Sequence, residues 1–375
     1  MKIAVVTRML RKEKLEGFGV FTHEILSRMV KAHPEHEFLF LFDRKYDDTF
    51  IYADNVKPYI LFPRASHPKL LVFWYQFLLR RFLKKHKPDV LVSPDGGIPL
   101  KTNVKTLAVI HDLNFEHYPE DLPEKVRDYY QYYYRRIAGV ATRLVTVSEY
   151  SKGDLEKIYG TDPGKTDVVY NGAGAQFTVL AESAKAETRK QYASSMPYFL
   201  FVGSIHRRKN LPNMIKAFTE FRKSSSVEMK FIIAGARRWW NDELEDAYKN
   251  STCRDDIVFT GRIDNSELPA LTGAAFALLF ASRFEGFGIP IIEAMKCGVP
   301  VITSTNSSMP EVAGDAGLLV DADSVSEIAA AMKKIAEDDS LRKELSLKGI
   351  KRAEKFSWDE SASMFWKSIE KTVSQ

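Results

Sequence analysis

Cysteines, metal-ligand groupings and long apolar runs are scarce in this chain of 375 residues. Only Cys253 and Cys297 are present, so there is no disulfide framework or CxxC pair, and a reducing cytosol is the expected compartment. No apolar run approaches the ~20 residues of a membrane span, and no secretory leader is expected. No histidine, cysteine and aspartate group has metal-ligand spacing, so no metal is expected.

Acidic residues are also missing from one stretch, between Asp54 and Asp89. Residues 57–87, called the basic segment below, surround the aromatic run 70–79. A basic helix with an aromatic face suits an anionic membrane surface or a lipid-linked acceptor. A buried helix with a solvated basic end is the alternative. The excess is local and no nucleic-acid-binding module is present, so no nucleic acid partner is expected. The bases are Lys57, Arg64, Lys69, Arg80, Arg81, Lys84, Lys85 and Lys87.

The length favours two domains, and both halves have the same pattern. Short apolar runs alternate with amphipathic stretches, which indicates an α/β protein with parallel sheets covered by helices. Turn-forming residues place a linker at 171–195. Strands are expected at 2–7, 37–42, 89–93, 105–110, 143–147 and 166–170, then at 198–202, 229–234, 256–260, 275–280, 299–302 and 317–320.

The most informative stretch joins a buried strand to the start of a helix at Glu285-Gly286-Phe287-Gly288-Ile289-Pro290. The glycines allow a sharp turn with uncovered peptide N–H groups, and Pro290 suits the first helical turn. Such a helix start is a ready site for an anion such as a diphosphate. Glu285 would lie at the mouth of the turn and Glu293 about one turn into the helix. For either glutamate alone, a helix-dipole preference is an equal alternative.

This stretch resembles the E-G-F-G-x-P-x-x-E-A signature of the retaining glycosyltransferases of family 4, and it matches without a gap from Glu285 to Ala294. The resemblance implies the GT-B fold, in which two Rossmann-like parallel-sheet domains face a central cleft. It implies an acceptor-side domain at 1–172 and a nucleotide-sugar-binding domain at 173–355. The segment 356–375 would be a C-terminal helix that crosses back to the first domain.

The resemblance also implies roles for residues of the second domain. Gly203 and Ser204 begin a segment whose Arg208 and Lys209 would grip the donor diphosphate, neutralising its charge without a metal. Glu285 would lie beside the donor sugar, and Glu293 would bind the ribose hydroxyls. Arg262 would border the nucleobase, and the backbone at Phe287, Gly288 and Ile289 would meet the phosphates.

In the first domain, Gly17-Phe18-Gly19 forms a second glycine turn, and with Glu16 it repeats the tetrapeptide at 285–288. Its place between a strand and a helix fits two glycine turns that close on one nucleotide sugar, so these three residues are expected to help bind the donor. A dinucleotide-binding fingerprint would need glycine where Thr22 stands, which argues against an NAD enzyme. His111 ends a strand, and the resemblance implies that it lies beside the donor sugar and helps to place sugar hydroxyls or the acceptor.

These observations predict a cytoplasmic hexosyltransferase that moves a sugar from a nucleotide-sugar donor to a hydroxyl acceptor with retention. The donor would be GDP-mannose or a UDP-hexose, and no cofactor is expected. The basic segment and the tyrosines of 129–134 favour a lipid-linked glycan acceptor in surface polysaccharide synthesis, with peripheral contact at the inner membrane face. An epimerase and a non-catalytic nucleotide-sugar-binding protein are the alternatives.

Overall fold

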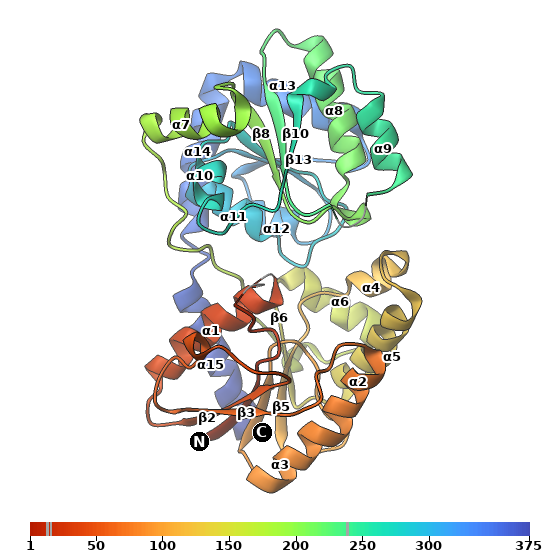
Figure 1. The fold of residues 1–375 in the computed structure, drawn as a ribbon, viewed down its shortest axis with the longest axis vertical. Coiled ribbons are helices and arrows are strands. Elements are labelled where there is room, and N and C mark those ends of the chain that lie inside the picture. The colour runs from red at the N-terminus through yellow and green to blue at the C-terminus, as the bar shows by residue number, and fades with distance from the viewer. Residues whose placement is uncertain (13–14, 16, 238–239) are drawn as a thin grey trace. The chain divides into compact units, whose positions relative to one another are not determined.

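The computed structural model describes residues 1–12, 15, 17–237 and 240–375. The chain divides into two compact units, each built around one sheet (Figure 1). Unit 1 comprises Met1–Asn171 together with Trp358–Gln375, and unit 2 comprises Gly172–Ser357. Glu16, which belongs to the predicted tetrapeptide repeat, lies outside the described residues.

The sheet of unit 1 has seven parallel strands in the order β3-β2-β1-β4-β5-β6-β7. Because all strands run the same way, their carboxyl ends share one edge, and the chain reverses its direction of progress between β1 and β4. Ligands of open parallel sheets bind at such a point. The strands are Lys2–Val6, Glu37–Phe42, Val56–Ile60, Val90–Ser93, Lys105–Val109, Arg143–Thr146 and Thr166–Val168, numbered β1 to β7.

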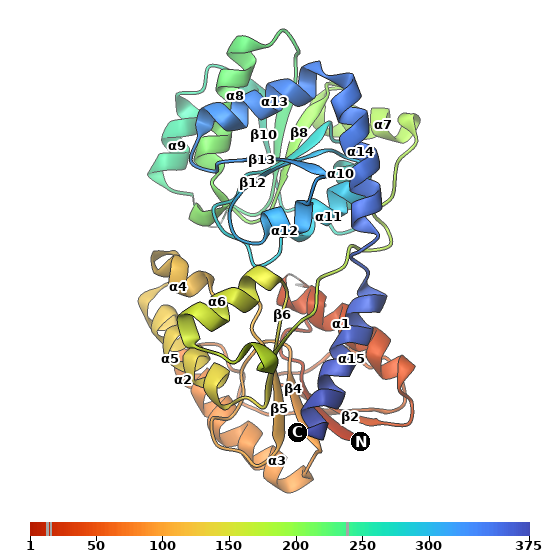
Figure 2. The ribbon, with the colours of Figure 1, turned by 180° about the vertical axis from the view of Figure 1, so that it is seen from behind.

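Helices cover the sheet of unit 1, and one of them comes from the end of the chain. Helix α15 lies beside α1 (Figure 2). Phe21 on α1 makes edge contacts with Trp358 and Phe365 on α15. Arg28 on α1 also pairs with Asp359 on α15. The helices are α1 Phe18–Ala32, α2 Pro68–Phe73, the π-helical η2 Trp74–Leu79, α3 Arg80–His86, α4 Asn114–His117, α5 Glu124–Val140, α6 Glu149–Tyr159 and α15 Trp358–Ser374.

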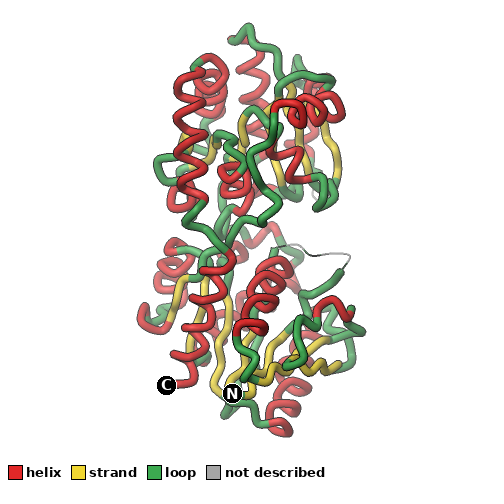
Figure 3. Tube along the Cα trace, turned by 90° about the vertical axis from the view of Figure 1, so that its left-hand side faces the viewer, coloured by secondary structure: helices red, strands yellow, loops and turns green. Residues whose placement is uncertain are grey.

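Unit 2 repeats this plan with six parallel strands in the order β10-β9-β8-β11-β12-β13, flanked by helices (Figure 3). The strands are Tyr198–Val202, Lys230–Ala234, Ile257–Gly261, Ala277–Phe280, Val301–Ser304 and Gly317–Val320, numbered β8 to β13. The helices are α7 Glu182–Ala193, α8 Leu211–Ser224, α9 Asp242–Lys249, α10 Leu268–Gly273, α11 Ile289–Lys296, α12 Met309–Ala313, α13 Val325–Glu337 and α14 Asp339–Ala353.

Two expectations from the sequence were wrong. Strand β3 was not predicted, because Pro58 interrupts its apolar pattern; it is tolerated because β3 is an edge strand. The segment 171–195 is not a plain linker, since it contains α7. That helix has few large apolar residues and buries only Thr188 and Ala193, so its sequence carried little apolar periodicity.

Candidate functional site

The glycine turn of unit 2 lies between β11 and α11, at the carboxyl edge of the sheet. Gly288 caps the helix with φ of +100°, a left-handed conformation that a side chain would strain. A Cβ at Gly288 would also lie 3.0 Å from Cδ1 of Ile291. Ile289 opens the helix and Pro290 occupies its first turn, as predicted from the sequence.

Glu285, in this turn, is buried between two cations. Its Oε2 accepts a hydrogen bond from Nη1 of Arg208 at 2.9 Å, and its Oε1 accepts one from Nζ of Lys209 at 2.5 Å. Both cations come from the short turn after β8, and β8 pairs with β11. The structure therefore brings together three of the predicted residues from neighbouring strand ends.

This cluster fixes the charge of the carboxylate. Burial alone would raise the pKa of Glu285, but the charges of Lys209 and Arg208 lower it to about 2. Arg208 is held in turn, because its Nη1 also donates to the carbonyl of Phe284 at 2.8 Å. Asn210, in a left-handed conformation, donates to the carbonyls of Ala281 and Ala322 at 3.0 and 2.6 Å. The basic pair is thus fixed to the rim of the glycine turn.

Two serines that the sequence analysis did not single out hold the same turn. The amide of Glu285 donates to Oγ of Ser307 at 3.0 Å. Oγ of Ser308 donates to the carbonyls of Glu285 and Phe287 at 2.9 and 3.0 Å. Paired serines before a short helix are common, so no sequence signal marked them as partners of a turn more than twenty residues earlier.

Glu293 has a different environment on α11. Its side chain is half-buried, and no hydrogen bond or ion pair is formed by it within the described part of the chain. Burial raises its pKa to about 8. The two predicted glutamates therefore have opposite protonation preferences: Glu285 is ionised at neutral pH and Glu293 is largely protonated. Divergent carboxyl pKa values are typical of functional sites.

The remaining predicted residues of unit 2 follow β8 and β10. A Cβ on Gly203 would lie 3.7 Å from Cε of Lys209, so Gly203 adjoins the basic pair, and Ser204 follows it. Gly235, after β9, packs so closely that a Cβ there would lie 1.8 Å from the carbonyl oxygen of Gly203. The amide of Gly235 donates to the carbonyl of Gly261, next to Arg262, at 2.8 Å. The loops after three neighbouring strands are thus in contact.

In unit 1, His111 follows β5 and is buried. Its Nε2 donates to the carbonyl of Pro94 at 2.9 Å, which leaves the Nδ1 lone pair to accept. Its ring stacks on Phe18 at 4.2 Å between centroids. Burial lowers the pKa of His111 to about 4, so the imidazole is neutral at physiological pH. It lines a pocket of about 150 Å³ with Phe18, Asp112, Tyr130 and Tyr134 among its walls.

The glycines beside Phe18 have separate structural reasons. Gly17 caps α1 with φ of +48°. A Cβ on Gly19 would lie 2.8 Å from the carbonyl oxygen of Met9, so this position requires a residue without a side chain. The turn therefore brings Phe18 to His111, a contact within unit 1 that the sequence did not indicate.

The sequence analysis also missed a buried polar network at the same edge of unit 1. Arg8 follows β1, Asp43 follows β2 and Asp95 lies after β4, and all three are buried. Nη1 of Arg8 donates to Oδ2 of Asp95 at 2.7 Å, and Nε donates to Oδ2 of Asp43 at 3.4 Å. Tyr75 donates to the same Asp95 oxygen at 2.7 Å. The available signal was a charged residue directly after each buried strand.

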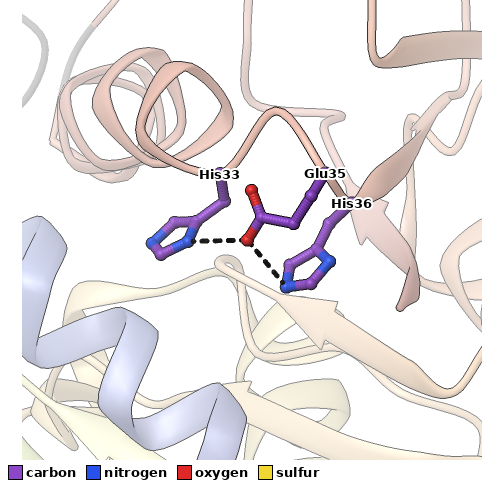
Figure 4. Close-up of side chains that lie close together, drawn as sticks. All are labelled: His33, Glu35 and His36. Atoms are coloured by element: carbon purple, nitrogen blue, oxygen red, sulfur yellow. Dashed lines mark ion pairs between the residues drawn. The ribbon is translucent and has the colours of Figure 1, made fainter.

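One group of three possible metal ligands occurs among the described residues, although none was expected. Glu35 lies between His33 and His36, 3.6 Å from Nδ1 of one and 3.3 Å from Nε2 of the other (Figure 4). His33 stacks on Trp366 at 3.6 Å, and Nδ1 of His36 lies 3.0 Å from the amino group of Met1. These residues precede β2, at the sheet edge opposite His111, so they are separate from the candidate site.

The basic segment is neither wholly buried nor wholly exposed. Trp74, Tyr75 and Leu79 are buried against unit 1. On the other face, Phe73 and Phe77 are 42% and 63% exposed, and their rings stack at 5.7 Å. Over the described residues, no helix is both long enough and apolar enough to cross a bilayer.

Two family descriptions match the chain. The description "Glycosyltransferase Family 4" matches residues 15–177, and "Glycosyl transferases group 1" matches residues 184–352. The O-antigen chain mannosyltransferase B of Escherichia coli is 26% identical over 373 residues, covering 96% of this chain and 97% of that protein. The O-antigen chain mannosyltransferase RfbU of Salmonella typhimurium is 29% identical over 266 residues, covering 71% of this chain and 70% of its own.

Solved structures show the same fold. Sucrose-phosphate synthase from Thermosynechococcus elongatus has a TM-score of 0.78 at 18% identity and covers 99% of this chain and 98% of its own. Anabaena HepE in complex with UDP and glucose has a TM-score of 0.76 at 16% identity, over 99% and 100% of the two chains. The predicted α/β class and GT-B fold are confirmed. The chain belongs to the group 1 glycosyltransferases of family 4.

Proposed function

We propose that this glycosyltransferase moves a hexose from a nucleotide-sugar donor to a hydroxyl acceptor with retention of configuration. The observation that carries the proposal is the cluster in which Glu285 joins Arg208 and Lys209 beside the Gly288 helix start. Two cations, a carboxylate and a helix N-terminus at one strand edge are suited to a diphosphate next to a sugar.

The donor would bind unit 2 through these groups. Arg208 and Lys209 would take the diphosphate, and the peptide N–H groups at Phe287, Gly288 and Ile289 would support it. Glu293 would bind the ribose hydroxyls. Its half-buried carboxyl has no ion-pair partner in the described chain, so it remains available for this contact. Gly203, Ser204 and Arg262 would border the rest of the nucleotide.

Departure of a nucleoside diphosphate builds negative charge, and the basic pair would stabilise it in the transition state. We therefore propose a reaction that needs no metal or other cofactor. Glu285, held ionised, would support the positive charge that develops at the anomeric carbon. The leaving phosphate would accept the proton of the attacking hydroxyl on the same face, which gives retention.

In unit 1 we propose that His111 positions the acceptor. Its Nδ1 can accept a hydrogen bond from a hydroxyl because Nε2 is engaged with Pro94 and the ring is neutral. The aromatic walls of the adjoining pocket, including Tyr130 and Tyr134, suit the face of a sugar ring.

The relatives favour one donor and one acceptor class. Both curated relatives above are named as O-antigen chain mannosyltransferases. GDP-mannose is therefore the donor we propose first, and a lipid-linked glycan at the cytoplasmic face of the membrane is the proposed acceptor. A UDP-hexose remains the alternative donor.

The exposed face of the basic segment supports peripheral membrane contact. Phe62, Phe73 and Phe77 are 77%, 42% and 63% exposed, and no acid interrupts the segment. A hollow of about 790 Å³ beside α3 has five basic residues in its lining. Exposed aromatic rings next to bases suit an anionic bilayer, with about 1 kcal/mol per base near the surface. The five are Arg80, Lys84, Lys87, Lys101 and Lys105.

Donor binding is tested by thermal unfolding of the purified protein with GDP-, UDP-, ADP- and dTDP-sugars. A donor at about 100 times its Kd adds ~2.7 kcal/mol of stability. A shift confined to GDP-mannose would identify the donor, whereas no shift with any of them would refute the donor assignment.

Product analysis without acceptor separates the transferase from an epimerase, because an epimerase turns over without an acceptor. Glu285→Ala should still bind nucleotide but should lose turnover. A non-catalytic nucleotide-sugar-binding protein would have no turnover to lose, so this result would exclude it.

Membrane contact is tested by co-sedimentation with vesicles. Phe73→Ser/Phe77→Ser should lower binding to anionic vesicles, while Leu347→Ser, which changes an exposed apolar residue of α14 in unit 2, should not. Equal binding of wild type to zwitterionic and anionic vesicles would contradict the electrostatic part of the proposal.

A further inference from the structure

Three arginines of unit 1 lie at the carboxyl edge of the sheet beside the buried Arg8–Asp43 pair. Arg44 follows β2 and forms a two-pronged contact with Asp43, through Nε to Oδ1 at 2.6 Å and Nη2 to Oδ2 at 2.9 Å. Arg64 precedes Ala65, whose amide donates to the same Oδ2 at 3.1 Å. Arg11 follows β1 on the neighbouring strand.

Asp43 cannot neutralise these charges. Its two oxygens already accept from Arg8, Arg44 and the amide of Ala65. Burial first, and then the positive charge of Arg44, lower the pKa of Arg11; Asp43 opposes them, and Arg64 acts with Arg44. Arg11, Arg44 and Arg64 follow β1, β2 and β3, which are neighbours in the sheet, and the aspartate among them is already engaged.

Two of the three guanidinium groups have no partner in the described part of the chain. Nε of Arg11 is buried and makes no hydrogen bond, and neither Arg11 nor Arg64 forms an ion pair within that part. A buried donor without an acceptor is uncommon in native proteins, and a bound ion is one of the explanations for it. Like charges that lack a counter-charge among the described residues repel one another, so a ligand that supplies negative charge would be favoured.

We propose that Arg11, Arg44 and Arg64 form a binding site for a diphosphate group of the acceptor. Guanidinium groups suit this ligand because each presents several N–H donors in a plane to phosphate oxygens. The assignment of the diphosphate to an acceptor rests on the proposed transferase function. The anion site itself rests on the geometry of unit 1 alone.

The position of the site separates the diphosphate from the reacting hydroxyl. Arg44 follows β2 and His111 follows β5, and the strand order places three strand spacings between them. At about 4.8 Å for each spacing this is about 14 Å. The anion and the hydroxyl therefore belong to different parts of the acceptor, which fits a glycan carried on a diphosphate.

The experiment measures binding of inorganic diphosphate by calorimetry. Because Arg208 and Lys209 would also bind diphosphate, the background protein is Arg208→Ala/Lys209→Ala. In that background, Arg11→Gln/Arg64→Gln should weaken binding at least tenfold, since two charge-assisted contacts are lost. Lys31→Gln, an exposed charge in the last turn of α1, is the matched control and should change binding less than twofold.

Farnesyl diphosphate separates the two sources of the group. If farnesyl diphosphate binds more tightly than inorganic diphosphate, and Arg11→Gln/Arg64→Gln removes that binding, the ligand is a lipid-linked diphosphate. Equal affinity for the two compounds supports a free diphosphate. Unchanged diphosphate affinity in Arg11→Gln/Arg64→Gln would overturn the site. If that variant unfolds, Arg11→Lys/Arg64→Lys, which keeps both charges, must still bind more weakly because the planar contact is lost. Titration of GDP and UDP into the wild type reports the donor site separately, so failure of the proposed function leaves this result intact.

Discussion

Glu293→Gln should make the protein more stable at alkaline pH and at the same time poorer at binding nucleotide. The carboxyl has a pKa raised to about 8 by burial, whereas an unfolded glutamate titrates near 4.5. Between these values the folded state holds a proton that the unfolded state has released. Stability is therefore highest below about pH 4.5, falls as pH rises towards 8 and is constant above it.

The magnitude follows from the difference in pKa. A separation of about 3.5 units at ~1.4 kcal/mol each gives a ceiling of about 5 kcal/mol. The side chain is half-buried, so partial solvation reduces this, and we expect about 2 kcal/mol. Glutamine has no proton to lose and removes the penalty. At pH 8 the variant should melt about 4–8 °C above the wild type, with no difference at pH 4.

The assay is thermal unfolding of wild type, Glu293→Gln and Glu187→Gln from pH 4 to 9, followed by nucleotide titration at pH 7. Glu187 is an exposed residue of α7, so its variant should follow the wild-type curve. Weaker nucleotide binding together with greater stability would identify Glu293 as a group retained for function at the expense of the fold. Parallel curves for wild type and Glu293→Gln would refute the reasoning.

Three further changes test other features. Glu285→Gln should abolish turnover and destabilise the protein by about 3 kcal/mol in thermal unfolding at pH 7, because two cations lose their carboxylate. The stabilising contribution of that carboxylate is present above about pH 4.5 and is lost as pH falls towards 2. Unchanged activity would contradict this role. Gly288→Ala should destabilise by ~1–3 kcal/mol, whereas Gly153→Ala, in a helix with open space around it, should not. Arg8→Met should cost about 3–5 kcal/mol in denaturant unfolding, because the buried Asp95 loses its cation and the buried Asp43 keeps only Arg44, while Arg254→Met should stay within about 0.5 kcal/mol.

Most strands were predictable because their apolar runs are buried on both faces of a parallel sheet. The runs at Lys2–Val6 and Tyr198–Val202 are nearly continuous, and helices and turns separate them from the next strand. Strand β3 was not predicted because its proline and its partly exposed residues interrupt the apolar pattern. Helix α7 escaped because only two of its residues are buried.

The candidate site was predictable where it depends on local chemistry. Gly288 and Pro290 predict a helix start, which the structure confirms. Two adjacent cations after a strand predict an anion site, and this stays a prediction. The sequence could not show which residues far apart in the chain contact one another. The link from Ser308 to Glu285 and the network of Arg8 with Asp43 and Asp95 depend on strand order, which no local pattern encodes.

Helix α15 affects the order in which the two units can fold during synthesis on the ribosome. Unit 1 is closed by residues that are synthesised after all of Gly172–Ser357, and these residues bury Trp358, Phe365 and Ile369. Until they emerge, the surface of α1 that contacts them lacks its cover. Unit 2 is a continuous segment, so it can complete its fold during translation before α15 is available to unit 1. A truncation just before Trp358 would thus leave unit 2 whole and uncover unit 1, the part of the protein that is made first.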